Sequence, residues 1–209
     1  MLDFLHHLFG FVCGQNPDHT WAPGGVLLPC CQRCLGLYAG AGVAALLHLW
    51  LRPQLTGRFL EAHGAFLLLM APFGFHWLPQ GPVLRTITGL LFGFGVFAFL
   101  WLPLSRRFFH RAAIEAGSAI VPIAVGRVSR HTPSSMLPSC SPYAIGLLLT
   151  VGLVPLLAAC GGRGTACALS ALVFIGLIAL AAAICGNAAL ALSAAVQFVR
   201  LRTQPRRPA

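Results

Sequence analysis

Long apolar segments alternate with short polar ones along most of the chain. Five stretches are long enough for a helix that crosses the hydrocarbon core of a bilayer, which takes about 17–25 residues. They run over residues 29–51, 59–79, 86–104, 143–160 and 166–199. The last stretch is uncharged and longer than a bilayer requires, so its helix must tilt, bend near Gly186 and Asn187, or project beyond the lipid. The pattern predicts an all-α, polytopic membrane bundle of about five transmembrane helices.

Two further segments have a helical pattern but do not suit a membrane span. The first twelve residues, MLDFLHHLFGFV, are apolar at Leu5, Leu8, Phe9 and Val12, which is helical spacing. This segment is too short to span, so we expect an N-terminal helix that lies in the membrane interface. Residues 112–126 are weakly apolar and contain a glutamate and a proline, and we interpret them as a second interfacial helix.

These elements divide the chain into three regions. Residues 1–105 hold the interfacial helix and three spans, and residues 106–142 form a loop with the possible interfacial helix. Residues 143–209 hold two further spans and a basic tail. The length of 209 residues suits one compact bundle of a few spans.

Composition supports a membrane protein and excludes several functions. The chain is 57% hydrophobic and only 9% charged, against averages of about 45–50% and 25% in soluble domains. It contains no lysine, which excludes the phosphate-binding lysine of a P-loop and a Schiff-base lysine for pyridoxal phosphate. The net charge of +10 does not indicate nucleic-acid binding, because the arginines lack a basic module with interleaved aromatic residues. The partner that the composition predicts is the lipid bilayer.

The arginines predict how the bundle is oriented. With five spans, Arg33, Arg85 and Arg163 fall on the side of the N-terminus, and the other eleven of the fourteen basic residues fall on the opposite side. A sixth span over residues 112–126 would change this division to 8 against 6 and remove the positive-inside signal. We therefore expect a multi-pass plasma-membrane protein with an extracytoplasmic N-terminus and a cytoplasmic C-terminus.

Three cysteines stand at the start of the first span, in LPCCQRCLGLYAG over residues 28–40. Cys31 and Cys34 are three residues apart, so their sulfurs can face one point at a helix start. The helix N-terminus favours thiolate over thiol, and Arg33 adds positive charge nearby. Metal ligation and disulfide exchange both need such thiolates, so the spacing alone leaves both readings open.

The motifs CGQNPDHTW (13–21), LPCCQRCLGLYAG (28–40) and LRTITGLLFG (84–93) resemble those of domain of unknown function family 2085, small uncharacterised prokaryotic membrane proteins. The resemblance covers about the first half of the chain. Gly14 and His19 replace a histidine and an arginine of the family pattern, and its Asp-Gly element is replaced around His76 and Trp77. The resemblance implies a site but no established activity. The residues that match are Cys13, Pro17, Cys31, Arg33, Cys34, Gly36, Tyr38, Arg85, Thr88 and Gly89.

All matched elements lie on the outer side in the predicted topology, which indicates a site formed by several segments. We expect Cys13, Cys31 and Cys34 to bind a metal ion, with His19 preferred to His76 as the fourth ligand. Zinc suits a thiolate-rich tetrahedral site. Cys30 is the spare thiol, because it points away from Cys31 and Cys34 in a helical start.

Several other residues near this site have two interpretations each. Arg33 and Arg85 either bind an anion or extend to lipid headgroups, and Tyr38 suits packing or the membrane interface. Cys160 and Cys167 flank the loop GGRGTA and form either a structural disulfide or two buried thiols.

Three functions remain open at this point. They are a membrane protein with an extracytoplasmic, zinc-like metal site, a membrane thiol-disulfide oxidoreductase that uses Cys31 and Cys34, and a non-enzymatic assembly or partner-binding protein. The four carboxylates of the chain do not lie deep in a span, which makes a proton relay or a paired-carboxylate hydrolase a poor fit.

Glycine spacing predicts one helix contact. Gly36 and Gly40 in the first span and Gly89 and Gly93 in the third are four residues apart, a pattern that lets helix backbones approach closely. We expect these two spans to cross in their outer halves and to bring Arg85 towards the Cys-x-x-Cys turn.

Overall fold

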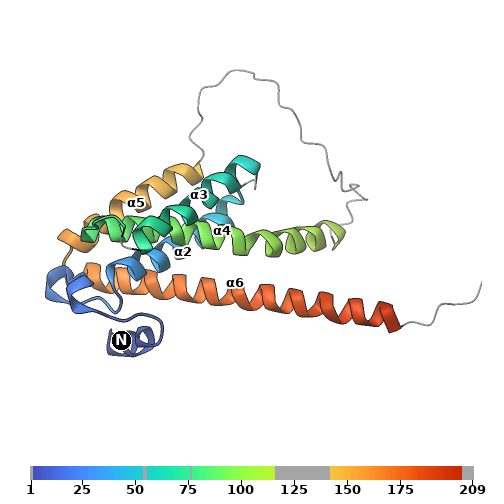
Figure 1. The fold of residues 1–209 in the computed structure, drawn as a ribbon, viewed down its shortest axis with the longest axis horizontal. Helices are drawn as coiled ribbons and strands as arrows, with labels where there is room; N and C mark the ends of the chain where they lie inside the picture. Colours follow the sequence, from blue (N-terminus) through green and yellow to red (C-terminus); the bar gives the residue numbers. More distant parts are fainter. Residues whose placement is uncertain (1, 54–55, 76, 116–141, 204–209) are drawn as a thin grey trace, which may run out of the picture.

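The computed structural model describes residues 2–53, 56–75, 77–115 and 142–203, and every regular element in these ranges is helical. The α-helices are α1 (Leu2–Gly10), α2 (Gln32–Leu51), α3 (Gly57–Gly74), α4 (Pro82–Glu115), α5 (Pro142–Cys160) and α6 (Arg163–Thr203). Two 3₁₀ turns, η1 (Pro17–His19) and η2 (Pro23–Gly25), lie between α1 and α2. The prediction of an all-α bundle is confirmed (Figure 1).

A helix occupies each of the five predicted spans. Four of them, α2, α4, α5 and α6, are long and apolar enough to cross a membrane. The fifth, α3, is shorter and less apolar, because Arg58 and Glu61 lie in its first two turns. It packs along α4 within the bundle. The fold is that of a multi-pass membrane protein.

The long last stretch is one continuous helix. Helix α6 has 41 residues, which corresponds to about 60 Å at 1.5 Å per residue, twice the roughly 30 Å of a hydrocarbon core. Figure 1 shows α6 as a nearly straight rod that continues past the other helices. The helix is not interrupted near Gly186 and Asn187, and Asn187 joins α6 to α4 by donating from Nδ2 to the Leu100 carbonyl at 2.8 Å. Tilt and projection beyond the lipid stay predictions.

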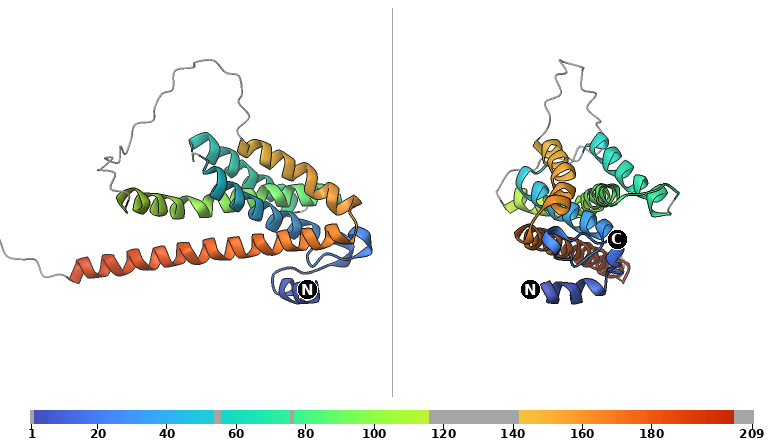
Figure 2. Two further views of the ribbon diagram at one scale, coloured as in Figure 1. Left: turned by 180° about the vertical axis from the view of Figure 1, so that it is seen from behind. Right: turned by 90° about the vertical axis from the view of Figure 1, so that its left-hand side faces the viewer.

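The N-terminal segment forms the predicted short helix. Leu5 and Phe9 of α1 are buried against the bundle, whereas Phe4 is 64% exposed. The end-on view in Figure 2 shows α1 lengthwise, so its axis runs across that of α6. A helix that lies across the spans, with apolar side chains on its outer face, has the form expected of an interfacial helix.

The second predicted interfacial helix, over residues 112–126, falls mostly outside the described residues. Its first four residues are the end of α4, which continues through Glu115 rather than ending near residue 104. The predicted regions 1–105 and 143–209 are not spatially separate, because α2 contacts α4 from the first and both α5 and α6 from the second.

Helices α2 and α4 cross where the glycines predicted it. A methyl group at Gly36 would overlap the Thr86 backbone and lie 2.7 Å from the Leu90 nitrogen. One at Gly93 would overlap the Leu37 carbonyl and lie 2.9 Å from the Ala41 nitrogen. Only glycine permits this approach, so the predicted contact of the first and third spans is confirmed.

Two histidines are buried, although the sequence suggested no role for them: His48 in the last turn of α2 and His63 in α3. His48 is 1% exposed and His63 is 3% exposed. His63 donates from Nδ1 to the Phe59 carbonyl at 2.8 Å, so its Nε2 accepts a hydrogen bond from the Tyr143 hydroxyl at 2.9 Å. The Tyr143 ring also meets that of His48 edge-on, 5.3 Å between centroids. The cluster joins α2, α3 and α5.

Candidate metal centre

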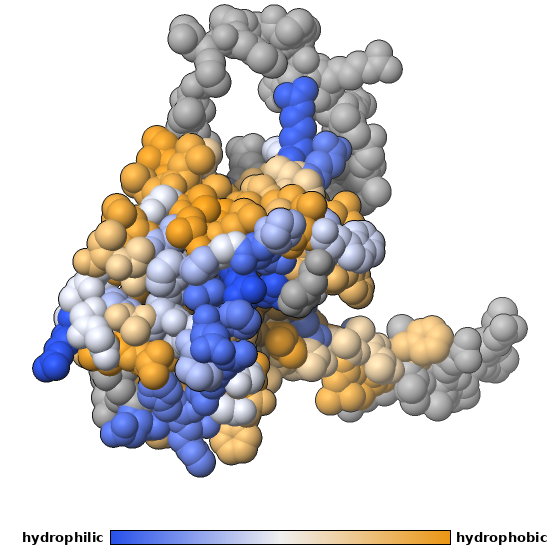
Figure 3. Space-filling view, turned by 60° about the vertical axis from the view of Figure 1, so that its left-hand side comes forward, coloured by the Kyte–Doolittle hydropathy of each residue, from blue (hydrophilic) through white to orange (hydrophobic). Residues whose placement is uncertain are grey.

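The site lies where the N-terminal segment meets the first turns of α2 and α4. Figure 3 brings this end of the molecule forward and shows hydrophilic side chains gathered at its centre and lower part, while hydrophobic side chains cover the helices above. A helix bundle with a polar end and apolar sides has the surface expected at the edge of a membrane.

Cys13 is positioned by the end of α1. Its backbone N–H donates to the Phe9 carbonyl at 2.8 Å, and Phe9 is fully buried with its ring 5.4 Å from that of Tyr38. The buried face of α1 therefore sets where Cys13 lies, and this residue is only 8% exposed.

Gln15 and Trp21 attach the following loop to the bundle. Gln15 donates from Nε2 to the His6 carbonyl at 2.6 Å and to the Pro29 carbonyl at 2.8 Å, and its backbone is in the left-handed region with φ 45°. Trp21 donates from Nε1 to Thr86 Oγ1 at 2.9 Å. Sequence reasoning missed Gln15, although this residue stands two positions after Cys13 in CGQNPDHTW.

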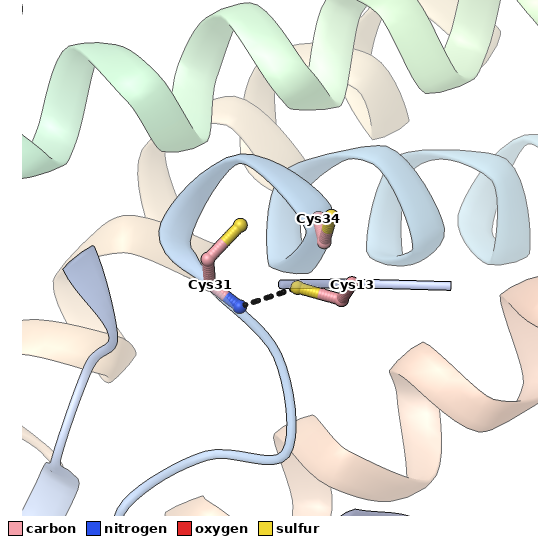
Figure 4. Close-up of side chains that lie close together, drawn as sticks. All are labelled: Cys13, Cys31 and Cys34. Atoms are coloured by element: carbon pink, nitrogen blue, oxygen red, sulfur yellow. Dashed lines mark hydrogen bonds between the residues drawn. The ribbon is translucent and has the colours of Figure 1, made fainter. Parts of the chain in front are cut away.

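Cys31 and Cys34 belong to the start of α2. Cys31 is the N-cap residue and has extended backbone angles, and Cys34 follows within the first turn. The Cys31 backbone N–H donates to Cys13 Sγ at 3.3 Å (Figure 4). This hydrogen bond brings a residue 18 positions away onto the N-terminus of α2.

The three sulfur atoms lie within 4.8 Å of one another. A tetrahedral zinc ion with bonds of about 2.3 Å holds its sulfurs about 3.8 Å apart, whereas a disulfide requires about 2.05 Å. All seven described cysteines are free thiols. The three sulfurs are therefore close enough together to share one metal ion, and no disulfide joins them.

Cys13 and Cys30, which lie before the first membrane span, differ strongly in the pKa of their thiols. Hydrogen bonds from the Cys31 thiol, and then from the Cys34 thiol, lower the pKa of Cys13 to about 2 despite the burial of this residue. Cys30 is fully buried, and burial raises its pKa well above the ordinary value. The cluster therefore contains a thiolate in Cys13, while Cys30, which is not among the three clustered sulfurs, stays protonated.

A cavity of about 330 Å³ opens beside the cluster. No carboxylate lines it, and three of its side chains carry basic nitrogens. The electrostatic character of its wall is therefore positive or neutral. The lining residues are Gly14, Gln15, Asn16, His19, Cys31, Gln32, Arg33, Cys34 and Arg85.

Arg85 and His19 form a pair on the wall of this cavity. The Arg85 guanidinium lies 2.6 Å from His19 Nδ1, and arginine can only donate, so Nδ1 accepts. Arg85 thus comes near the Cys-x-x-Cys turn, as the helix crossing predicted. His19 lines the cavity but is not among the ligand atoms within 4.8 Å.

Arg33 has a second set of partners. Its Nη2 donates to the Phe73 carbonyl and to Gln80 Oε1, both at 3.1 Å, while its Nε is buried without a partner. Arg33 therefore joins α2 to the segment between α3 and α4 and also lines the cavity.

The remaining predicted site residues that the structure describes are not among the three clustered sulfurs. Tyr38 is buried against Phe9 and does not line the cavity. His76 lies outside the described residues. Cys160 ends α5 and Cys167 lies in the first turns of α6, both as exposed free thiols; the disulfide between them stays a prediction.

The fold and the site define a multi-pass membrane protein with a three-cysteine cluster at one end of its bundle. The family described as "Predicted membrane protein (DUF2085)" matches residues 13–99, which contain the cluster and the crossing of α2 with α4. The predicted resemblance is confirmed over this first half of the chain. No curated protein and no solved structure matches the chain significantly.

Proposed function

We propose that this protein holds a metal ion, of which zinc is the best fit, on the thiolates of Cys13, Cys31 and Cys34. The observation that carries the proposal is the convergence of three sulfurs within 4.8 Å from two separate segments. Ligands from two segments let an ion join the N-terminal loop to α2, so the ion would stabilise the outer end of the bundle.

The low pKa of Cys13 supports the proposal. A cysteine binds a metal ion as the thiolate. Binding therefore releases one proton from every ligand cysteine that starts as a thiol. Because Cys13 is already ionised, fewer protons must leave when the ion binds. The backbone N–H of Cys31 on Cys13 Sγ is the kind of outer hydrogen bond that orients a metal ligand.

The proposed centre faces the extracytoplasmic side of the plasma membrane. The arginine distribution supports this orientation, because Arg33 and Arg85 stand at the cluster while most other arginines lie at the opposite ends of the spans. The chemistry is therefore available to ions and small molecules outside the cytoplasm.

Metal analysis of the purified, full-length protein in detergent tests the proposal. We expect close to one zinc ion per chain in the wild type and a large loss in the Cys31→Ser, Cys34→Ser double variant. The matched control is Cys160→Ser, Cys167→Ser, which also removes two thiols and should keep the metal. Substoichiometric metal together with a Cys31–Cys34 disulfide would instead favour the thiol-disulfide oxidoreductase.

A further inference from the structure

The cavity lies against only part of the cysteine cluster. Cys31 and Cys34 line it, whereas Cys13 is buried and does not. An ion held by three protein sulfurs has one tetrahedral position left. Given the proposed metal centre, on which this inference rests, that position faces a space of about 330 Å³, which is at the small end of ligand pockets.

His19 does not offer a free lone pair to that position. Its Nδ1 accepts from Arg85, so in the neutral ring Nε2 carries the hydrogen. His19 could become a ligand only after the contact with Arg85 breaks. The arrangement instead gives the cavity wall an N–H donor on His19 and a guanidinium on Arg85.

Gln32 provides a further polar group on the same wall. The residue is 4% exposed, it lines the cavity, and its Oε1 atom is buried without a hydrogen-bond partner. A buried acceptor without a donor costs about 1–3 kcal/mol. An N–H or O–H donor that reaches this oxygen would remove this cost.

Charge decides what kind of fourth ligand suits the site. A divalent ion with three thiolates has a net charge of −1, and an anionic fourth ligand lowers it further. The guanidinium groups of Arg33 and Arg85 line the cavity and offset this negative charge. A soft donor atom suits a thiolate-rich centre, and a carboxylate suits the planar guanidinium of Arg85.

We propose that the cavity binds a small thiol that carries a carboxylate. Its sulfur bonds to the metal after losing a proton to solvent, and no atom changes oxidation state. Its carboxylate pairs with Arg85 on the cavity wall. The centre is therefore an open site that recognises a small extracytoplasmic thiol.

Cobalt-substituted, full-length protein allows this binding to be measured, because cobalt-thiolate absorption bands change when the fourth ligand changes. The two probes are mercaptoacetate and ethanethiol, which share the thiol, whereas only mercaptoacetate has the carboxylate. We expect both to shift the bands, with mercaptoacetate binding more tightly. Arg85→Gln should weaken mercaptoacetate binding about tenfold, the effect of losing a charged hydrogen bond, and leave ethanethiol binding within about twofold.

Two variants serve as controls. Arg58→Gln removes an exposed arginine at the start of α3 and should change neither affinity. His19→Gln should keep the cobalt and its bands, because His19 is not the fourth ligand in this proposal. Loss of cobalt or of its tetrahedral bands in His19→Gln would identify His19 as the ligand and overturn the open site.

The outcomes separate this inference from the metal centre itself. Failure of the wild type to bind cobalt overturns the proposed function. Stoichiometric cobalt with bands that neither thiol shifts overturns only the thiol site. An equal loss of affinity for both thiols in Arg85→Gln shows that Arg85 supports the cluster rather than the carboxylate, and it overturns the proposed recognition.

Discussion

Cys13 differs chemically from its neighbour Cys30, although both are buried at the same end of the bundle. Cys13 accepts hydrogen bonds from the Cys31 and Cys34 thiols and from the Cys31 backbone, which stabilise its negative charge. Cys30 is outside the cluster, and its pKa is raised first by burial and then by repulsion from the charges of Cys13 and Cys31. Burial without donors disfavours the thiolate, whereas burial with several donors supports it.

This difference predicts how the metal-free, reduced protein titrates. At about pH 5 a thiol with an ordinary pKa of about 8.5 is protonated, whereas Cys13, with its pKa lowered to about 2, is ionised. The thiolate absorbance in the far ultraviolet should therefore persist at this pH and disappear in Cys13→Ser. Cys30→Ser is the control, because a thiol of raised pKa contributes no thiolate. Equal spectra for the wild type and Cys13→Ser would contradict the assignment.

At the scale of single residues, sequence patterns identified part of the site. Cys31 and Cys34 were predictable because three residues in a helix start place two side chains on one face. The position of Cys13 depends on the loop that Gln15 and its two carbonyl partners hold in place, and no local pattern encodes such distant contacts. The pairing of His19 with Arg85 likewise joins residues 66 positions apart.

At the scale of elements, the crossing of α2 and α4 positions the site, because it brings Arg85 beside the turn that contains Cys31 and Cys34. The crossing depends on backbones in direct contact at Gly36, Gly40, Gly89 and Gly93. Contacts of this kind are a main source of association between helices in a membrane, where apolar side chains gain little by leaving lipid.

A substitution at this crossing should destabilise the fold. Gly36→Ala places a methyl group against the backbone of Thr86 and Leu90, and overpacking of this kind costs about 1–3 kcal/mol. We expect a lower midpoint of thermal unfolding in detergent. Gly152→Ala in α5 is the control, because a methyl group there meets no atom within 4 Å, and alanine favours a helix over glycine. A Gly36→Ala protein as stable as the wild type would argue against the close crossing.

At the scale of the whole molecule, α2 organises the bundle. Its N-cap and first turn carry Cys31 and Cys34, and it contacts α4 and α6 along its length. Its last turn brings His48 to the aromatic cluster around Tyr143. The polar hydrogen bond between His63 and Tyr143 then joins α3 to α5. One helix thus connects the candidate metal centre at one end of the bundle with a buried polar cluster at the other.

The arginines predict which end faces the cytoplasm. A reporter that is active only in the cytoplasm should be active when fused after Arg207 and silent when fused after Arg163, because the basic tail stays inside. Fusions at both positions with matched expression levels measure this directly. The reverse pattern would place the cysteine cluster on the cytoplasmic side and exclude the proposed extracytoplasmic centre.

The sequence by itself determined the all-helical fold, the places of the long apolar segments and the Cys-x-x-Cys turn. It predicted five spans, whereas four of the described helices are long and apolar enough to cross a membrane. These features are local, because the length of an apolar segment and the spacing of its residues depend only on neighbouring positions in the sequence. The glycine pairs also predicted which helices meet, since a small residue every fourth position is a local signal for close packing.

Only the tertiary structure decided how the predicted site residues contact one another and how far α4 and α6 extend. Cys13 lies beside Cys31 and Cys34, and Arg85 donates a hydrogen bond to His19 Nδ1, both through contacts between distant segments. The Oε1 atom of Gln32 is buried without a hydrogen-bond partner. The continuous course of α6 and the extension of α4 to Glu115 were also open in sequence. Each depends on which surfaces of folded helices meet, and this is a property of the assembled bundle rather than of any one segment.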